Sequence, residues 1–367
     1  MPLDVVTLTD RAAGCLLGGA LGDALGAPVE FLQLTDIQRR YGPQGITEPP
    51  RPALITDDTQ LTLFTAEGML LAAIRGRHRG LDSTVEQVWY SYRRWLRTQQ
   101  QSEPDEDDVA LLDDPRLFAS RAPGLTNLRA LRDEQLPRSP RTHPRNDARS
   151  CGGVVRMAPA GFTTSAADAY ALGCECAALT HGHPTGWAPA GALALLVHLL
   201  AVRNRPLDEA VDQVIGRVMR DDLETAHTLS TAVRLAETDN AAAWAAQEAR
   251  INGQPVPDGG PSVRSLELLG SGWLGHEALA IAVYVALTHP RPGQFVDALR
   301  MAANHSGDSD STASITGNIL GALHGTGVLP RDWVNRLELA EVITQVGADL
   351  AAELCGVAYN EDHYLIA

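Results

Sequence analysis

The chain has 367 residues, 44% of them hydrophobic, so it is long enough to bury a large core. Only 5% of the residues are aromatic, and the abundant Ala and Gly suit tightly packed helices, which predicts a mainly α-helical fold. The net charge is −15, from 30 basic and 45 acidic residues. No long basic run is present, so we do not expect a protein that follows a nucleic-acid backbone.

The cysteines and the apolar segments bear on the compartment. The five cysteines are odd in number and scattered, which argues against a disulfide framework. Cys174 and Cys176 could suggest zinc, but no second pair follows at zinc-site spacing, so buried thiols are the simpler interpretation. Residues 1–10 do not form a signal peptide, and the longest apolar run, 190–202, is too short to span a bilayer. We therefore expect a reduced, cytoplasmic protein without a membrane segment.

The first predicted helix, 11–27, carries glycines at a strict period of four, at Gly14, Gly18, Gly22 and Gly26. Each interior Gly costs about 1 kcal/mol relative to Ala. A ridge of glycines therefore makes sense only where other backbones approach closely, which predicts a central, buried helix. Asp23 lies within it and Glu30 follows it. Unpaired buried charge is costly, so Glu30 either has a role in a site or lies exposed in the following loop.

An acidic start marks the next helix, after a connection over 31–55 that Gly and Pro residues interrupt. The residues Thr56, Asp57, Asp58 and Thr59 precede apolar residues at helical spacing. A Thr cap with acids in the first turn is a common helix start. Capping explains one Asp more readily than two adjacent ones, which leaves a cation site as the alternative.

A polar, irregular region over 99–149 follows a predicted helix at 85–96. It contains an acidic run at 103–108 and a basic, Pro-rich stretch at 137–145. Because helical patterns resume on both sides, we interpret the region as a loop insertion near the mouth of a site, within a single domain that covers 1–367. Its charge runs are expected to be solvated.

A glycine-rich segment, 150–157, and a pair of histidines, His181 and His183, are the next candidate binding elements. Backbone amides exposed by glycine can bind phosphate, and a helix-packing turn is the alternative. The histidines could bind metal or phosphate, or could cap a helix. Further helices are predicted at 166–178, 189–202, 207–237, 240–251 and 277–287.

The second acidic cluster lies far from the first in the sequence. Asp308 and Asp310 are surrounded by hydroxyls and precede apolar residues at every fourth position, with Gly325 as the stop. Hard divalent cations prefer such a set of oxygens. The simpler alternative is a capped loop. Two clusters of this kind, each at a helix start, favour a cation site.

Several motifs, taken in order over nearly the whole chain, resemble those of the ADP-ribosylglycohydrolase family, which includes dinitrogenase-reductase-activating glycohydrolase. They are 18–26 with Glu30, 56–59, 151–156, His181, Gly272 and Trp273 with 277–279, and 307–312. The resemblance implies a compact, orthogonal all-α bundle with a binuclear metal site at its centre. It also implies hydrolysis of the bond between ADP-ribose and a modified acceptor.

The resemblance assigns two metal ions, Mg²⁺ most readily and Mn²⁺ as the alternative. The implied metal ligands are Thr56, Asp57, Asp58, Asp308, Asp310 and Ser311. Ser311 departs from the family, which typically has Thr at this position, but its hydroxyl can still act as a ligand. The implied catalytic residues are Glu30, Asp58 and Asp310, and whether Glu30 or Asp58 handles the water stays open.

The implied substrate-binding residues are Cys151, Gly152, Gly153, His181, Gly272 and Trp273. This chain has Ala148 and Ser150 where many relatives have Ser and Gly, which puts part of the phosphate contact in doubt. We expect a metal-dependent monomeric hydrolase that removes ADP-ribose from a protein side chain, most readily arginine. The alternatives are a serine, nucleic-acid-end or ester linkage, or a protein that binds ADP-ribose without catalysis.

Overall fold

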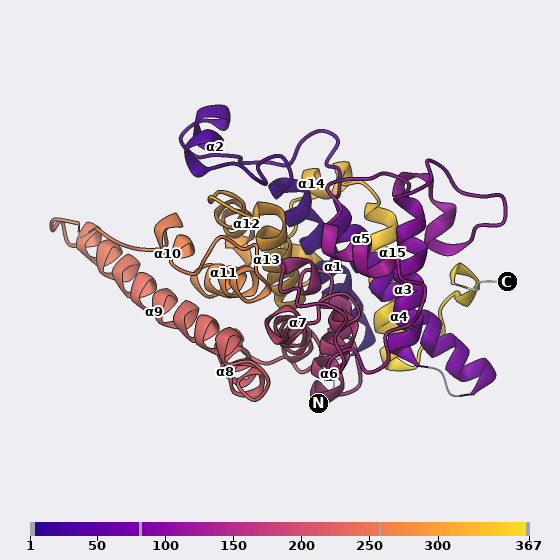
Figure 1. Ribbon diagram of the computed structural model, residues 1–367. Coiled ribbons are helices and arrows are strands. Elements are labelled where there is room, and N and C mark those ends of the chain that lie inside the picture. Colours follow the sequence, from indigo (N-terminus) through magenta and orange to yellow (C-terminus); the bar gives the residue numbers. More distant parts are fainter. Residues whose placement is uncertain (1–3, 81–82, 257, 365–367) are drawn as a thin grey trace.

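Two helices that are distant in sequence, α1 (Val5–Gly26) and α13 (Ser309–His324), pack against each other at the centre of the fold (Figure 1). The structure is a computed structural model that describes residues 4–80, 83–256 and 258–364. Within these ranges the secondary structure is helical, with only two isolated β-bridges, Ala53–Leu337 and Ser150–Leu274. The predicted all-α fold is therefore confirmed.

The glycine ridge of α1 is the contact surface for α13. A Cβ atom on Gly18 would overlap the carbonyl oxygen of Gly317, and a Cβ on Gly317 would overlap that of Gly18. At the end of α1, a Cβ on Gly26 would overlap the backbone of Asp310. The predicted close approach of another backbone is confirmed. The predicted start at residue 11 is wrong, because Asp4 caps the helix by accepting a hydrogen bond of 3.0 Å from the amide of Thr7.

Other helices surround this central pair. Helix α3 (Asp57–Arg79) packs against α4 (Thr84–Thr98) and α15 (Ala340–Cys355), and α6 (Ala166–Ala178) packs against α7 (Pro184–Val197). Helix α11 (Gly275–Thr288) contacts α9 (Leu223–Ile251), which runs along one side of the molecule (Figure 1). The remaining α-helices are α2 (Leu34–Tyr41), α5 (Leu125–Leu131), α8 (Leu207–Val218), α10 (Val263–Glu267), α12 (Phe295–Ala303) and α14 (Arg331–Arg336).

Short 3₁₀ and π segments complete the chain. The 3₁₀ turns are Ala110–Asp113, Pro115–Leu117, Cys151–Gly153, Ala158–Gly161, Pro292–Gln294, Thr326–Val328 and Glu361–His363. Helix α7 continues as a π-helical segment, His198–Val202. The apolar helix is therefore longer than the run 190–202, and its 19 residues meet the length and hydropathy of a membrane span. Because 94% of its apolar window is buried inside the fold, it is a core helix.

Three predicted boundaries in the periphery are wrong. Helix α2 lies within the predicted connection 31–55, and α5 lies within the polar region 99–149. The break predicted near residue 238 occurs instead between α8 and α9, because Asp222 caps α9 by accepting a hydrogen bond of 3.1 Å from the amide of Thr225. The side-chain cap of Asp222 thus decides where α9 begins, whereas α2 and α5 begin without a side-chain cap.

The contact between α1 and α13 predicts the effect of a single methyl group. Gly18→Ala places a Cβ against the backbone of α13, so we expect a loss of about 1–3 kcal/mol in the free energy of unfolding. The matched control is Gly216→Ala in α8, where the added Cβ would meet no atom within 4 Å. That change should leave stability unchanged or raise it by up to about 1 kcal/mol. Urea unfolding measures both, and equal effects would contradict a backbone contact at Gly18.

Candidate active site

The two acidic clusters meet at the end of α1. The first turn of α3 and the first turn of α13 are joined by a hydrogen bond of 2.8 Å from the Ser311 hydroxyl to Oδ2 of Asp58. Glu30, Asp308 and Asp310 each offer a carboxylate oxygen, and these oxygens lie within 4.8 Å of one another. Among the described residues, they are the one group of acidic, His or Cys side chains this compact. The structure therefore brings both predicted clusters and Glu30 into one place.

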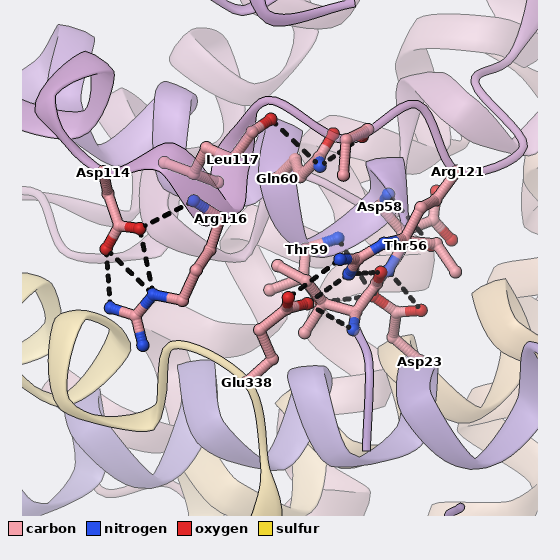
Figure 2. Close-up of polar contacts among 12 residues, drawn as sticks. Asp23, Thr56, Asp58, Thr59, Gln60, Asp114, Arg116, Leu117, Arg121 and Glu338 are labelled. Carbon is pink, nitrogen blue, oxygen red and sulfur yellow. Dashed lines mark hydrogen bonds and ion pairs between the residues drawn. The ribbon is translucent and has the colours of Figure 1, made fainter. Parts of the chain in front are cut away.

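Asp23 holds the first turn of α3 in position. This fully buried carboxylate accepts hydrogen bonds from the amides of Thr56 and Thr59, at 2.9 and 3.2 Å, and from the Thr59 hydroxyl (Figure 2). Thr56 in turn caps the helix, since its hydroxyl oxygen accepts a hydrogen bond of 3.2 Å from the amide of Asp58. The sequence marked Asp23 as an unusual buried charge, but its partners could not be identified from the pattern.

Residues of the polar region 99–149 also contact the first turn of α3. Arg121 donates a hydrogen bond of 2.9 Å to the carbonyl of Ile55 and pairs with Glu338 (Figure 2). Glu338 also accepts a hydrogen bond of 3.2 Å from the amide of Ile55. The Gly124 amide donates 3.0 Å to Oδ2 of Asp57. Part of the predicted insertion therefore lies directly against the acidic cluster.

The first turn of α13 is held by a different set of contacts. Asp308 caps this helix, and its amide donates a hydrogen bond of 2.9 Å to the carbonyl of Ser271. The Cys151 thiol donates to Oδ2 of Asp308 at 2.6 Å. The amide of Ser311 donates to Oδ1 of Asp310 at 2.9 Å. Cys151 therefore lies at the acidic cluster, whereas Cys174 and Cys176 are buried elsewhere as free thiols.

Burial and mutual repulsion shift the pKa of every carboxyl group in the cluster. Desolvation, followed by the charges of Asp308 and Asp57, raises the pKa of Glu30 to about 8. Desolvation also raises the pKa of Asp57 to about 7, against a lowering contribution from the Gly124 amide. The pKa values of Asp58 and Asp310 are raised as well, first by desolvation and then by neighbouring carboxylates. The cluster is thus an environment that favours bound protons or bound cations over free carboxylates.

The glycine-rich segment forms a wall next to the cluster. The Cys151 amide donates a hydrogen bond of 3.0 Å to the carbonyl of Trp273. A Cβ on Gly152 would lie 3.7 Å from Nε2 of His181, and a Cβ on Gly153 would lie 2.6 Å from the carbonyl oxygen of Gly186. Small residues at these positions therefore let the wall approach His181 and the start of α7.

The two histidines have different roles. His183 caps α7, since its Nδ1 accepts a hydrogen bond of 3.1 Å from the amide of Thr185. His181 is fully buried, with Nε2 2.9 Å from the Ser150 hydroxyl. Burial and the charge of Arg156 lower the pKa of His181 well below its usual value, so its imidazole is neutral. Of the pair, only His181 faces the glycine wall.

An aromatic pair lies at the rim of the site. Phe31 stacks on Trp273 with ring centres 5.1 Å apart and an angle of 18° between the planes. Phe31 is 67% exposed and has a left-handed φ of 65°, which is costly for a residue of this type. The Gly272 amide, whose own φ is 85°, donates 3.2 Å to Glu277. Phe31 belongs to no motif, so no pattern in the sequence singles it out.

A sequence model of the ADP-ribosylglycohydrolase family matches residues 4–362. Over 358 residues, the chain is 27% identical to the ADP-ribosyl-[dinitrogen reductase] glycohydrolase of Rhodospirillum rubrum, covering 93% of this chain and 96% of that protein. It is 26% identical to the ADP-ribosylarginine hydrolase Tri1 of Serratia proteamaculans (strain 568) over 363 residues, covering 96% of this chain and 81% of that protein.

The fold is likewise similar to a solved structure. An ADP-ribosylglycohydrolase-related protein complex contains a chain that superposes with a TM-score of 0.60 at 24% identity, covering 95% of this chain and 99% of that one. At this identity the likeness establishes the fold alone. The family match extends over nearly the whole length, and the chain therefore belongs to the ADP-ribosylglycohydrolase family, a family of ADP-ribosyl hydrolases.

Proposed function

We propose that this chain is a metal-dependent hydrolase that removes ADP-ribose from arginine side chains of a modified protein. The observation that carries the proposal is the junction of two buried acidic helix starts through Ser311 and Asp58. Arginine is the proposed acceptor because one relative is named an ADP-ribosylarginine hydrolase. An ADP-ribosylated protein is the proposed partner, as the name of the Rhodospirillum relative indicates for its own substrate.

The donor set fits divalent cations. Carboxylate and hydroxyl oxygens are the ligands that Mg²⁺ and Mn²⁺ prefer, and several buried carboxylates in contact are costly without a compensating charge. When bound, two such cations would bind the ribose hydroxyls and polarise a water molecule. We propose Mg²⁺ ahead of Mn²⁺. The residues proposed to hold the cations are Thr56, Asp57, Asp58, Asp308, Asp310 and Ser311.

The carboxyl groups themselves are proposed to handle the water and the charge at the anomeric carbon. Glu30 is half-buried at the edge of the cluster, and a pKa near neutrality suits a group that accepts a proton and returns it. Asp58 is the alternative base. Cleavage passes through an oxocarbenium-like state, which a nearby carboxylate such as Asp310 stabilises.

The glycine wall is proposed to bind the diphosphate. Glycine residues expose backbone amides, which donate to phosphate oxygens without the cost of burying a charged side chain. Neutral His181 and the half-buried Gly152 border the same corner. The proposed contacts to the substrate are Cys151, Gly152, Gly153, His181, Gly272 and Trp273.

The proposed activity predicts release of ADP-ribose from an arginine-modified protein in the presence of Mg²⁺. The double substitution Asp308→Ala/Asp310→Ala should lower kcat/KM by at least about a hundredfold, since it removes two oxygen ligands. The matched control, Asp297→Ala/Asp332→Ala, removes two exposed aspartates and should leave activity unchanged. Equal activity of the cluster variant and wild type would refute the metal role. Release from serine-linked substrate only would reassign the acceptor.

The hydroxyl of Ser311 predicts a graded pair of variants. Ser311→Ala removes the hydrogen bond to Asp58 and one proposed ligand, so we expect kcat/KM to fall by about tenfold to a hundredfold. Ser311→Thr retains the hydroxyl and should keep most of the activity. Steady-state kinetics with the arginine-linked substrate measure both. Full activity of Ser311→Ala would show that the hydroxyl is dispensable.

The raised carboxyl pKa values predict how the stability of the metal-free protein depends on pH. The folded state holds protons on Glu30 and Asp57 up to about pH 8 and about pH 7, whereas the unfolded chain releases them near pH 4. With EDTA, the free energy of unfolding should therefore fall as pH rises from about 5 to about 8. Saturating Mg²⁺ should reduce this fall, and Asp57→Asn should flatten it in EDTA. A flat profile for metal-free wild type would contradict the prediction.

A further inference from the structure

A fully buried arginine lies directly behind the glycine wall. Arg156 has no exposed surface, and among the described residues its hydrogen-bond partners are both neutral. Its Nη1 donates 2.6 Å to Oδ1 of Asn127, and its Nη2 donates 2.6 Å to Oγ1 of Thr180. The guanidinium carbon lies 4.5 Å from the ring centre of Tyr92. A buried cation without a carboxylate partner is costly, so its retention needs an explanation.

Arg156 determines which way the Asn127 amide faces. A guanidinium can only donate, so Oδ1 of Asn127 must point to Arg156 and Nδ2 must point away from it. A Cβ placed on Gly152 would lie 3.1 Å from this Nδ2. Asn127 is only 1% exposed, and the described residues provide no acceptor for Nδ2. An N–H group that makes no hydrogen bond to a described residue therefore faces the corner that Gly152 leaves open.

The second branch of contacts reaches His181 through Thr180. Oγ1 of Thr180 lies 2.8 Å from Nδ1 of His181 and 3.3 Å from the carbonyl of Ala177. Donation from Arg156 polarises the hydroxyl, which makes it a better donor and a poorer acceptor. Its hydrogen therefore goes to the nearer acceptor, Nδ1. The proton of the neutral imidazole is then on Nε2, which donates to Oγ of Ser150 at 2.9 Å.

We propose that Arg156 is a positioning residue that sets the direction of both branches, so that Asn127 Nδ2–H and the Ser150 hydroxyl are presented at Gly152 as donors to a diphosphate. This inference rests on the proposed function for its ligand, ADP-ribose. Ser150 already accepts from His181, so its own hydrogen is left to point outward. The buried positive charge also favours an anion at this wall, within a chain of net charge −15.

A purely structural role for Arg156 would predict lost stability and nothing more. The directional role predicts a specific imidazole tautomer in the ligand-free protein, with hydrogen on Nε2 and none on Nδ1 of His181. Ring ¹⁵N chemical shifts report this directly. They do so without any dependence on turnover.

The experiment compares three substitutions in the full-length chain by ¹⁵N NMR of His181, calorimetric binding of ADP-ribose with Mg²⁺, and steady-state kinetics. Thr180→Val removes the hydroxyl at similar volume, Thr180→Ser restores it, and Arg156→Lys keeps the charge but cannot bridge two partners. The control is Thr316→Val, a buried Thr in α13 whose hydroxyl bonds only the carbonyl of Thr312.

We expect Thr180→Val and Arg156→Lys to shift the tautomer and weaken ADP-ribose binding by about tenfold to a hundredfold, with KM affected more than kcat. Thr180→Ser and Thr316→Val should behave as wild type. If Arg156→Lys does not fold, the Thr180 pair decides the question alone.

Two results would overturn the proposal in distinguishable ways. An unchanged tautomer in Thr180→Val, with affinity for ADP-ribose within about twofold of wild type, would refute the role of Arg156 and leave the proposed function intact. A wild-type protein that does not bind ADP-ribose would refute the proposed function, and with it the ligand assigned here.

Discussion

The backbone contact between α1 and α13 is the constraint on which the site depends. Glycines on both helices let backbone meet backbone at several points, such as Gly18 against Gly317, so the two helices approach closely. The contact continues to Gly26, which lies against the first turn of α13 at Asp310. Glu30 lies only four residues after Gly26, just beyond the end of α1. The same period of glycines that builds the core therefore sets the position of Glu30 relative to the acidic start of α13.

The first turn of α3 forms the other half of the site, and carboxylates that accept hydrogen bonds from backbone amides hold it in place. Asp23 uses its oxygens to hold the amides of Thr56 and Thr59, so it positions the turn that carries Asp57 and Asp58 (Figure 2). Arg121 and Glu338, which form an ion pair, both bond to the backbone of Ile55, directly before this turn. This arrangement buries several carboxyl groups and raises their pKa values. The stability of the metal-free protein is therefore expected to depend on pH.

The sequence predicted what depends on local patterns. Apolar spacing located most helices, the glycine period identified the buried one, and two acidic caps identified the residues that meet at the site. It did not predict the partner of Asp23, the start of α1 at Val5, or the break before α9, because these depend on caps and on contacts between distant segments. His181 and His183 lie two residues apart in the same turn, and only the packing of α7 against the glycine wall separates their roles.

The contacts of Arg156 also bear on how an acidic protein accommodates an anionic ligand. The carboxylates of the site lie at the starts of α3 and α13, whereas Arg156 is buried behind Gly152 and its charge lowers the pKa of Asp57. The site therefore combines several buried carboxylates with one buried positive charge next to the glycine wall. A diphosphate bound at the glycine wall, as proposed, would meet the positive charge of Arg156 there. Under the proposed function, this local positive charge matters more for binding than the net charge of −15 of the whole chain.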